Sequence, residues 1–579
     1  MDPKVAPSPC SEDCLSTRDE KFNSCLQHCQ DSAAAPESQL TTQRGEYRWP
    51  RIALQPQYPQ ISGEQLATEL KQIYGGLVMV ESKCMEIDSQ KLKNPEEPLS
   101  AEQWQALEAL HRTLLHEHHD FLMTTQHPTA NAALVGLSTK YCMPARIWKH
   151  GIHSFLEVLR HRRPASQEYM LAFIHSAYQM IGWLLESVPS FTDTWMECLG
   201  DLARYRMAIE EDREIQTIWR NTAARWYTMA ADRHPCVGRL YHHAGILERP
   251  SLRKLYFYAR ALTSVDPFLN AEESLRALCA PVLNDRRSFR RVPSAEALVI
   301  SFHAEIFDSR NPTSIRLSGD AAINLLDQQP TNKIASIGVF LSVINIAALF
   351  GFGSPENVYR QVFETALAQG SQELPPGHVH ASAVSLARQS SLTKLSEAQY
   401  PSKAVYEFCY RSFNSTIRRE PSRDAFQDLL PFLHVMFVFL HSITALQSRL
   451  CFDKVIHNTS HSLLDWKDLD WVALSRFLNT LAIKYPITAH MESPAHSSTF
   501  PGDGAPLHED FLIRGLVWAQ WYFPATWFDK IEDDDGSRHL GDDDKKKQRA
   551  ARVLYLGMLL AETSDLIHYD QESRTFSTA

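Results

Sequence analysis

The chain has 579 residues, of which 44% are hydrophobic, 22% charged and 10% aromatic. This composition is globular and excludes both a disordered chain and a small disulfide-stapled scaffold. The formal charge of −10 argues against a surface built throughout to coat nucleic acid, so any phosphate-binding region must be local. Gly is scarce, at 22 residues, and long segments place Ala, Leu, Gln, Glu and Arg at helical spacing, which predicts an all-α fold.

The first 60 residues are rich in Ser, Gln, Pro and Ala and have no sustained helical period, so we predict a mostly disordered arm. The chain does not open with a charged leader and an apolar stretch, from which we expect no secretory signal, a reducing compartment and mostly free thiols. The arm carries two Cx3C pairs, which suit a zinc site or two disulfides, but spare cysteines in a tail are the favoured interpretation. These four residues are Cys10, Cys14, Cys25 and Cys29.

Helical periodicity begins after the arm. Ser62 precedes the first long amphipathic stretch, and Ser100 opens a second stretch with Gln103 three residues later, close to a capping box. A third helix is expected to start at Pro144 and to end before Pro164.

The next block carries a repeat. Two groups of residues follow the 4-3-5 spacing of the second half of a tetratricopeptide repeat, where small residues let two helices approach and proline ends the hairpin. The groups are Ala223, Tyr227, Ala230 and Pro235, and, 32 residues later, Leu255, Ala259, Leu262 and Pro267. The pattern predicts a short antiparallel helical solenoid from about 62 to 270.

Two apolar runs, 334–352 and 429–446, approach the length that spans a bilayer. Both contain polar residues and neither has a basic flank, so we interpret them as buried helices and expect no membrane association. The acidic and then basic stretch at 530–550 is expected to be a solvated, disordered loop, followed by a terminal helix and tail at 551–579.

The common catalytic patterns do not occur in the sequence: it has no Walker loop, GxSxG elbow, HExxH or dinucleotide glycine motif. We therefore expect a protein that is not an enzyme and uses no cofactor. One basic loop does stand out, in which four guanidinium groups surround a phenylalanine and suit phosphates and base stacking, although an exposed linker explains it equally well. Its arginines are Arg286, Arg287, Arg290 and Arg291.

A second motif is more specific. The core from Gly200 to Tyr205, GDLARY, resembles the phosphoserine-binding helix of 14-3-3 proteins, and the fuller GDLARYR resembles the Est/SMG family of telomerase-associated Est proteins and nonsense-mediated mRNA decay adaptors. The stretches YCMPARIWKHGIHSFLEVLRHRRP, GRLYHHAGILERPSLRKLYFYARAL and HEDFLIRGLVWAQWYFP are also similar to fungal members of the family. The resemblance covers about residues 61–528.

The resemblance implies a 14-3-3-like domain that merges into tetratricopeptide hairpins at 61–270, followed by an Est-type helical-hairpin domain, which binds DNA or RNA in the family, at 271–529. Carried over residue by residue, the phosphoserine pocket falls on His153, Arg160, Arg204 and Tyr205, with His242 as a peptide contact. His153 stands where the family has Lys, and because imidazole is only partly charged at neutral pH, phosphate binding is expected to be weaker or pH-sensitive.

Arg204 has two interpretations. In the first it is a surface charge of the phosphate pocket, which could be reversed without loss of stability; in the second it is a structural arginine paired with Glu197, Asp201 or another carboxylate. The resemblance also implies a phosphorylated protein partner, such as an RNA helicase of the decay pathway, with a related adaptor as a possible heterodimer partner. The alternative is a telomerase subunit that binds single-stranded DNA or RNA. We expect a location in nucleus and cytoplasm, and we expect no PIN nuclease domain after residue 551.

Overall fold

The computed structural model describes residues 61–284, 294–370, 402–419, 426–449, 468–487, 506–524, 527–528 and 542–578. Within these ranges the regular secondary structure is helical apart from one small hairpin, and the chain divides into two compact units, Met1–Ala230 and Ala231–Ala579. The predicted cysteine arm at 1–60 and the arginine loop at 286–291 lie outside the described residues.

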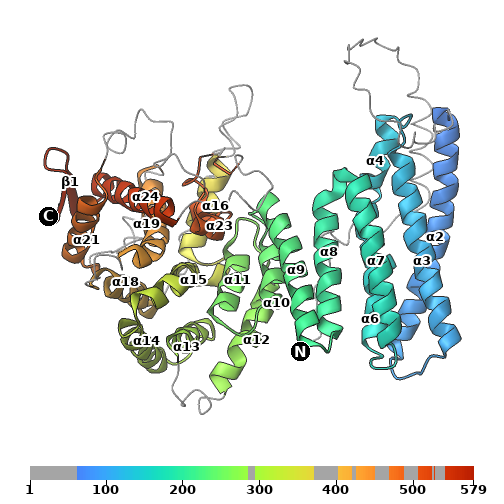
Figure 1. Cartoon of the computed structure of the whole chain (residues 1–579), viewed down its shortest axis with the longest axis horizontal. Coiled ribbons are helices and arrows are strands. Elements are labelled where there is room, and N and C mark those ends of the chain that lie inside the picture. Colours follow the sequence, from blue (N-terminus) through green and yellow to red (C-terminus); the bar gives the residue numbers. More distant parts are fainter. Residues whose placement is uncertain are drawn as a thin grey trace, which may run out of the picture. The chain divides into compact units, whose positions relative to one another are not determined.

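The first unit is built from long helices packed side by side, coloured blue to green in Figure 1. Its elements are α2 (Gly63–Lys93), α3 (Ala101–Thr125), α4 (Ala132–Lys140), α5 (Met143–Arg146), the π-helix η2 (Ile147–His153), α6 (Ser154–Arg160), α7 (Gln167–Ser187), the 3-10 turn η3 (Pro189–Phe191), α8 (Thr192–Ile209) and α9 (Arg213–Arg233), which runs across the boundary. They enclose one apolar core that includes Leu70, Trp104, Phe155, Phe173 and Trp195.

Helix starts follow the predicted caps. The Ser62 hydroxyl accepts from the backbone N–H of Gln65 and the Gln65 side chain accepts from the N–H of Ser62, a complete capping box. Ser100 and Gln103 form a second one at the start of α3. Each box satisfies backbone N–H groups that the first helical turn leaves without partners, which fixes where these helices begin.

A π-helix joins α5 to α6. The wider turn of η2 leaves backbone groups for side chains to satisfy, and the buried His111 donates from Nδ1 to the carbonyl oxygen of Gly151 (3.0 Å). His111 is in turn 3.2 Å from Asp88 on α2. This irregular turn is therefore held by buried contacts to α2 and α3, and it ends at His153, the first predicted pocket residue.

The second unit surrounds a pair of apolar helices. It contains α10 (Gly238–Leu247), α11 (Leu252–Thr263), α12 (Ala271–Asn284), α13 (Ala295–Phe307), α14 (Pro312–Asp327), α15 (Thr331–Leu349), the 3-10 turn η5 (Gly351–Gly353), α16 (Val358–Gly370), α18 (Lys403–Ile417), α19 (Phe426–Arg449), α21 (Trp471–Lys484), α23 (His508–Ile513), the 3-10 turn η7 (Val517–Ala519) and α24 (Asp542–Thr563). α15 and α19 pack against each other, with α11 on α15 and α24 on α19.

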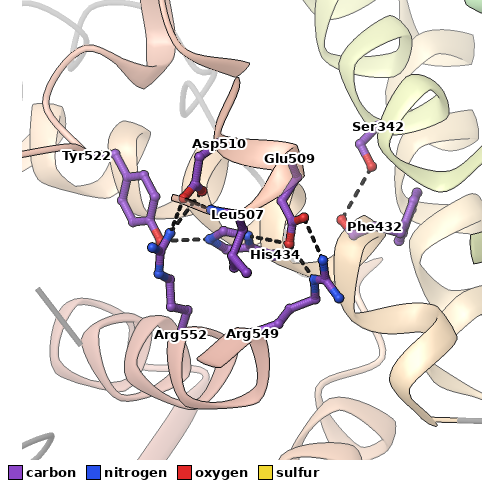
Figure 2. Close-up of polar contacts among 9 residues, drawn as sticks. All are labelled: Ser342, Phe432, His434, Leu507, Glu509, Asp510, Tyr522, Arg549 and Arg552. Carbon is purple, nitrogen blue, oxygen red and sulfur yellow. Dashed lines mark hydrogen bonds and ion pairs between the residues drawn. The ribbon is translucent and has the colours of Figure 1, made fainter. Parts of the chain in front are cut away.

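α15 and α19 are the two apolar runs recognised in the sequence. By length and composition alone, Thr331–Leu349 and Gln427–Leu446 could each cross a membrane, but most of both stretches is buried inside the unit. The Ser342 hydroxyl, which lies between them, donates to the carbonyl oxygen of Phe432 (3.3 Å, Figure 2). A helix that is apolar on all sides suits this central position, in agreement with the interpretation of both runs as buried core helices.

The repeat prediction places its residues at helix contacts: Ala223, Tyr227 and Ala230 are buried on α9, and Leu255, Ala259 and Leu262 are buried on α11. The boundary between compact units falls at Ala230, ahead of the domain boundary expected at 270, because α11 packs along α15 of the second unit.

The prediction of a disordered loop at 530–550 is wrong for its last part. α24 begins at Asp542, so residues 542–550 are helical. The tail expected after the terminal helix also has structure: β1 (Ile567–Asp570) and β2 (Thr575–Thr578) form an antiparallel hairpin in which Ile567 pairs with Thr578. The side-chain amide of Asn479 on α21 makes two hydrogen bonds with the backbone of Phe576, which attaches the hairpin to the unit.

Candidate functional site

Two helices of the first unit bring four of the five predicted phosphoserine-pocket residues together. His153 ends η2 directly before α6 and Arg160 ends α6, so the two are seven residues apart and on one face, while Arg204 and Tyr205 lie on α8. The His153 and Tyr205 rings meet edge to face with their centroids 6.4 Å apart, and the Arg204 guanidinium lies 5.4 Å from the Tyr205 ring centroid.

A fifth side chain, which the sequence analysis did not include, joins the two helices. Glu157 accepts a hydrogen bond from the Tyr205 hydroxyl at Oε1 (2.9 Å) and one from Arg160 Nη2 at Oε2 (2.5 Å). The sequence spacing could have indicated this residue, because Glu157 stands four residues after His153 and three before Arg160, on the same helix face. We call these five residues, His153, Glu157, Arg160, Arg204 and Tyr205, the α6–α8 cluster.

Arg204 is a buried, paired residue. Its Nη2 donates to Asp201 Oδ1 (2.9 Å) and its Nε to the Tyr227 hydroxyl (3.3 Å), while Tyr227 itself donates to Asp201 (2.5 Å). Only 7% of Arg204 is exposed. The expectation of a surface charge that could be reversed without loss of stability is therefore wrong, and the geometry is that of a structural arginine paired with Asp201.

The close approach of Tyr227 also accounts for the glycine of the GDLARYR motif. A Cβ atom at Gly200 would stand 2.6 Å from the Tyr227 ring, which leaves no room for any side chain at this position. The motif therefore combines the contact between α8 and α9 with the structural pair of Arg204 and Asp201.

Burial sets the protonation states in the cluster. Burial, helped by the Glu157 carboxylate, raises the pKa of Tyr205, so its hydroxyl keeps the proton that it donates. Burial also lowers the pKa of His153, and its Nε2 has no hydrogen-bond partner among the described residues. His153 is thus neutral at pH 7, and the cluster with Asp201 contains two guanidinium cations and two carboxylates.

The other predicted site residues fall elsewhere. His242 lies on α10 in the second unit, where its Nε2 is 2.8 Å from the Ser274 hydroxyl, and its peptide contact stays a prediction. The predicted nucleic-acid arginines Arg286, Arg287, Arg290 and Arg291 and the arm cysteines Cys10, Cys14, Cys25 and Cys29 lie outside the described residues. Within the described ranges, the six cysteines are free thiols and no group of three or more His, Cys, Asp or Glu residues could hold a metal.

The second unit contains a buried ionic network around the HEDFLIRG stretch (Figure 2). Glu509 receives two hydrogen bonds from Arg549 of α24 (2.5 and 2.8 Å), and Asp510 receives two from Arg552 (2.9 and 2.7 Å). Burial alone would raise the pKa of Glu509, but the Arg549 guanidinium keeps this pKa well below its usual range. The acidic pair thus binds α24 to the rest of the unit.

His434 of α19 completes this network. Its Nδ1 donates to Glu509 (3.3 Å), and its Nε2 accepts from the Tyr522 hydroxyl (2.7 Å), whose pKa burial raises. One imidazole can make both bonds without a second proton. His434, Glu509, Asp510 and Arg552 are buried and only Arg549 keeps part of its side chain exposed, so the network joins α19, α23 and α24.

Residues 223–280 match the family model described as the Est1 DNA/RNA binding domain. The chain is 22% identical over 340 residues to EST/SMG-like protein 2 of Saccharomyces cerevisiae, which covers 52% of this chain and 28% of that protein. It is 37% identical over 86 residues to Telomerase-binding protein EST1A of Danio rerio, which covers 14% of this chain and 5% of that protein.

The chain is thus similar in sequence to proteins of the Est/SMG family. It spans less than a third of the length of each of these two relatives. A chain in the crystal structure of Est1 and Cdc13 aligns with a TM-score of 0.52 and 10% identity, covering 86% of this chain and 99% of that one. The expected all-α fold, in which 14-3-3-like and tetratricopeptide-like helices precede further helical hairpins, is confirmed.

The segment matched by the domain model centres on a buried arginine. Arg260 donates to the hydroxyls of Tyr256 (2.7 Å) and Tyr241 (2.8 Å) and stacks on the Tyr241 ring at 3.7 Å. It also donates to the carbonyl oxygen of Arg514 (2.7 Å), directly before Gly515, whose φ of +80° and contact with Pro235 admit only glycine. These contacts are internal packing, and the buried Arg260 is not available to a phosphate.

Proposed function

We propose that this protein is a non-catalytic adaptor of the Est/SMG type that binds a phosphorylated protein partner through the α6–α8 cluster. The observation that carries the proposal is the meeting of Arg160, Tyr205 and His153 at one place in the first unit, where Arg160 keeps 27% of its side chain exposed. A guanidinium and a phenol hydroxyl are donors that suit phosphate oxygens.

The proposed partner is a phosphoprotein such as an RNA helicase of the nonsense-mediated decay pathway, with a related adaptor as a heterodimer partner and the nucleus and cytoplasm as the place of action. Kinship with EST/SMG-like protein 2 supports the family part of this proposal.

The test is fluorescence anisotropy of the full chain against a phosphorylated Ser-Gln peptide and its unphosphorylated twin. We expect phosphate-dependent binding by the wild type and its loss in Arg160→Ala. Arg112→Ala, which removes an exposed arginine of α3, is the matched control and should bind like the wild type. Equal affinity for the two peptides would overturn the proposal.

A second candidate function is that of a telomerase-associated subunit that binds single-stranded DNA or RNA. It is favoured by the match of residues 223–280 to the Est1 DNA/RNA binding domain and by kinship with Telomerase-binding protein EST1A. A single-stranded oligonucleotide included in the same anisotropy series separates the two functions, because binding to the oligonucleotide alone would move the ligand from phosphoprotein to nucleic acid.

A further inference from the structure

Glu157 takes up the donors that a phosphate would need in the α6–α8 cluster. One carboxylate oxygen accepts from the Tyr205 hydroxyl and the other from Arg160, and only 16% of the Glu157 side chain is exposed. A carboxylate and a phosphate present similar acceptor oxygens to a guanidinium. The two anions therefore compete for the same hydrogen bonds.

Charge adds to this competition. With Asp201 beside Arg204 and Glu157 beside Arg160, each guanidinium of the cluster already faces a carboxylate. A phosphate dianion that enters while Glu157 stays in place meets no net positive charge, and like charges at such short range repel. Binding therefore requires Glu157 to leave its position.

When a phosphate displaces the Glu157 carboxylate, a neighbouring histidine can serve as its new hydrogen-bond partner. Glu157 Oε2 is 3.8 Å from Nε2 of His161, whose side chain is 45% exposed. His161 is the C-cap residue of α6, four residues after Glu157 and facing solvent, so a change of side-chain rotamer can move the carboxylate toward it.

We propose that Glu157 is an internal competitor, a carboxylate that occupies the pocket in the free protein and that a phosphoserine ligand must displace. The proposal rests on the proposed function, since it concerns the same pocket. It differs from that function in predicting that the wild-type affinity is held down by one named residue.

The test compares phosphopeptide affinity in the wild type, Glu157→Gln and Glu157→Asp. Gln keeps the size and an acceptor for Tyr205 but removes the charge, so we expect tighter binding by about tenfold. Asp keeps the negative charge but holds it one carbon farther from Tyr205 and Arg160, so we expect a gain in phosphopeptide affinity smaller than that of Glu157→Gln. Glu86→Gln is the matched control, because it removes a carboxylate paired at i,i+3 with Lys83 on α2 and should leave the affinity unchanged.

The outcomes separate the two proposals. Wild-type affinity in both Glu157 variants would overturn the competitor role while leaving the adaptor function intact. Weaker binding in Glu157→Gln would also overturn it, since Glu157 would then hold the donors in position for the phosphate. If neither the wild type nor either variant distinguishes the phosphopeptide from its twin, the proposed function fails and the competitor role fails with it.

Discussion

Each arginine assigned to the phosphate pocket has a carboxylate three residues earlier on its own helix. Glu157 precedes Arg160, and Asp201 precedes Arg204, a spacing that predicts ion pairs from the sequence alone. Their unequal burial could not be predicted in this way. The Arg160 side chain is 27% exposed and that of Arg204 is 8% exposed, because the Tyr227 ring from α9 covers the second pair.

This difference in burial predicts unequal losses of stability for two alanine substitutions. Arg204→Ala leaves Asp201 buried without its cation and should lower the free energy of unfolding by about 3 kcal/mol or more. Arg160→Ala breaks a partly exposed pair and should cost less than about 1 kcal/mol. Urea unfolding followed by tryptophan fluorescence measures both. Equal costs would mean that the buried pair with Asp201 contributes nothing special to stability.

His303 predicts a pH dependence of stability. Burial lowers its pKa to about 3, while its Nε2 is 3.1 Å from Asn345 Oδ1. Well above pH 7 the imidazole is neutral in both the folded and the unfolded chain and contributes no pH dependence. Below the unfolded value near 6.5 the unfolded chain takes up the proton first, so stability falls with pH until the folded pKa is reached.

The expected loss from this residue between pH 7 and pH 5 is about 2 kcal/mol. His303→Gln, which keeps a donor for Asn345, should remove that part of the loss, whereas His175→Gln, at an exposed position of α7, should not. Urea midpoints at the two pH values provide the measurement. An unchanged pH dependence in His303→Gln would contradict the prediction.

At the scale of elements, local signals predicted where helices begin but not which charged residues become buried. Ser62 and Ser100 form the expected capping boxes, because a cap depends only on neighbours along the chain. The charge pattern after residue 541 predicts a solvated loop, yet this stretch forms the first turns of α24. The arginines of α24 donate hydrogen bonds to Glu509 and Asp510, which lie on a segment distant in the sequence. Local sequence patterns therefore could not identify these carboxylates as partners.

The burial of Arg552 predicts a large effect on stability. Its side chain is fully buried, with two hydrogen bonds to Asp510 and the guanidinium 4.6 Å from the Trp527 ring. Arg552→Met keeps much of the volume but leaves Asp510 buried without its cation, so we expect a loss of about 3 to 5 kcal/mol. Lys547→Met, which removes an exposed charge from the same helix, should change stability by less than about 0.5 kcal/mol. Thermal and urea unfolding measure the stability of both variants. Equal shifts of the unfolding midpoints in the two variants would contradict the prediction.

At the scale of the whole molecule, the sequence predicted the class of fold well, because helical periodicity and the Est/SMG motifs extend over most of the chain. It predicted the site less well. The motif GDLARYR correctly locates α8, but its arginine is engaged by Asp201 and Tyr227, and the residue that controls access, Glu157, belongs to no motif. Motifs record which residue types occur, whereas the occupancy of a pocket depends on packing between α6, α8 and α9.

The net charge of the chain predicts how its affinity for single-stranded nucleic acid depends on salt. A chain with a formal charge of −10 repels a polyanion at long range, so single-strand binding must come from a few local contacts, for which Arg290 and Arg291 are the sequence-based candidates. Each phosphate contact on a single strand contributes about 0.7 to the slope of log affinity against log salt, so replacing both arginines by Ala should reduce the slope by about 1.4. Replacing the exposed Arg112 and Arg163 of the first unit removes the same charge and should lower the affinity slightly without changing the slope. Titrations between 50 and 200 mM salt measure both, and an equal slope in all three proteins would exclude these arginines as phosphate contacts.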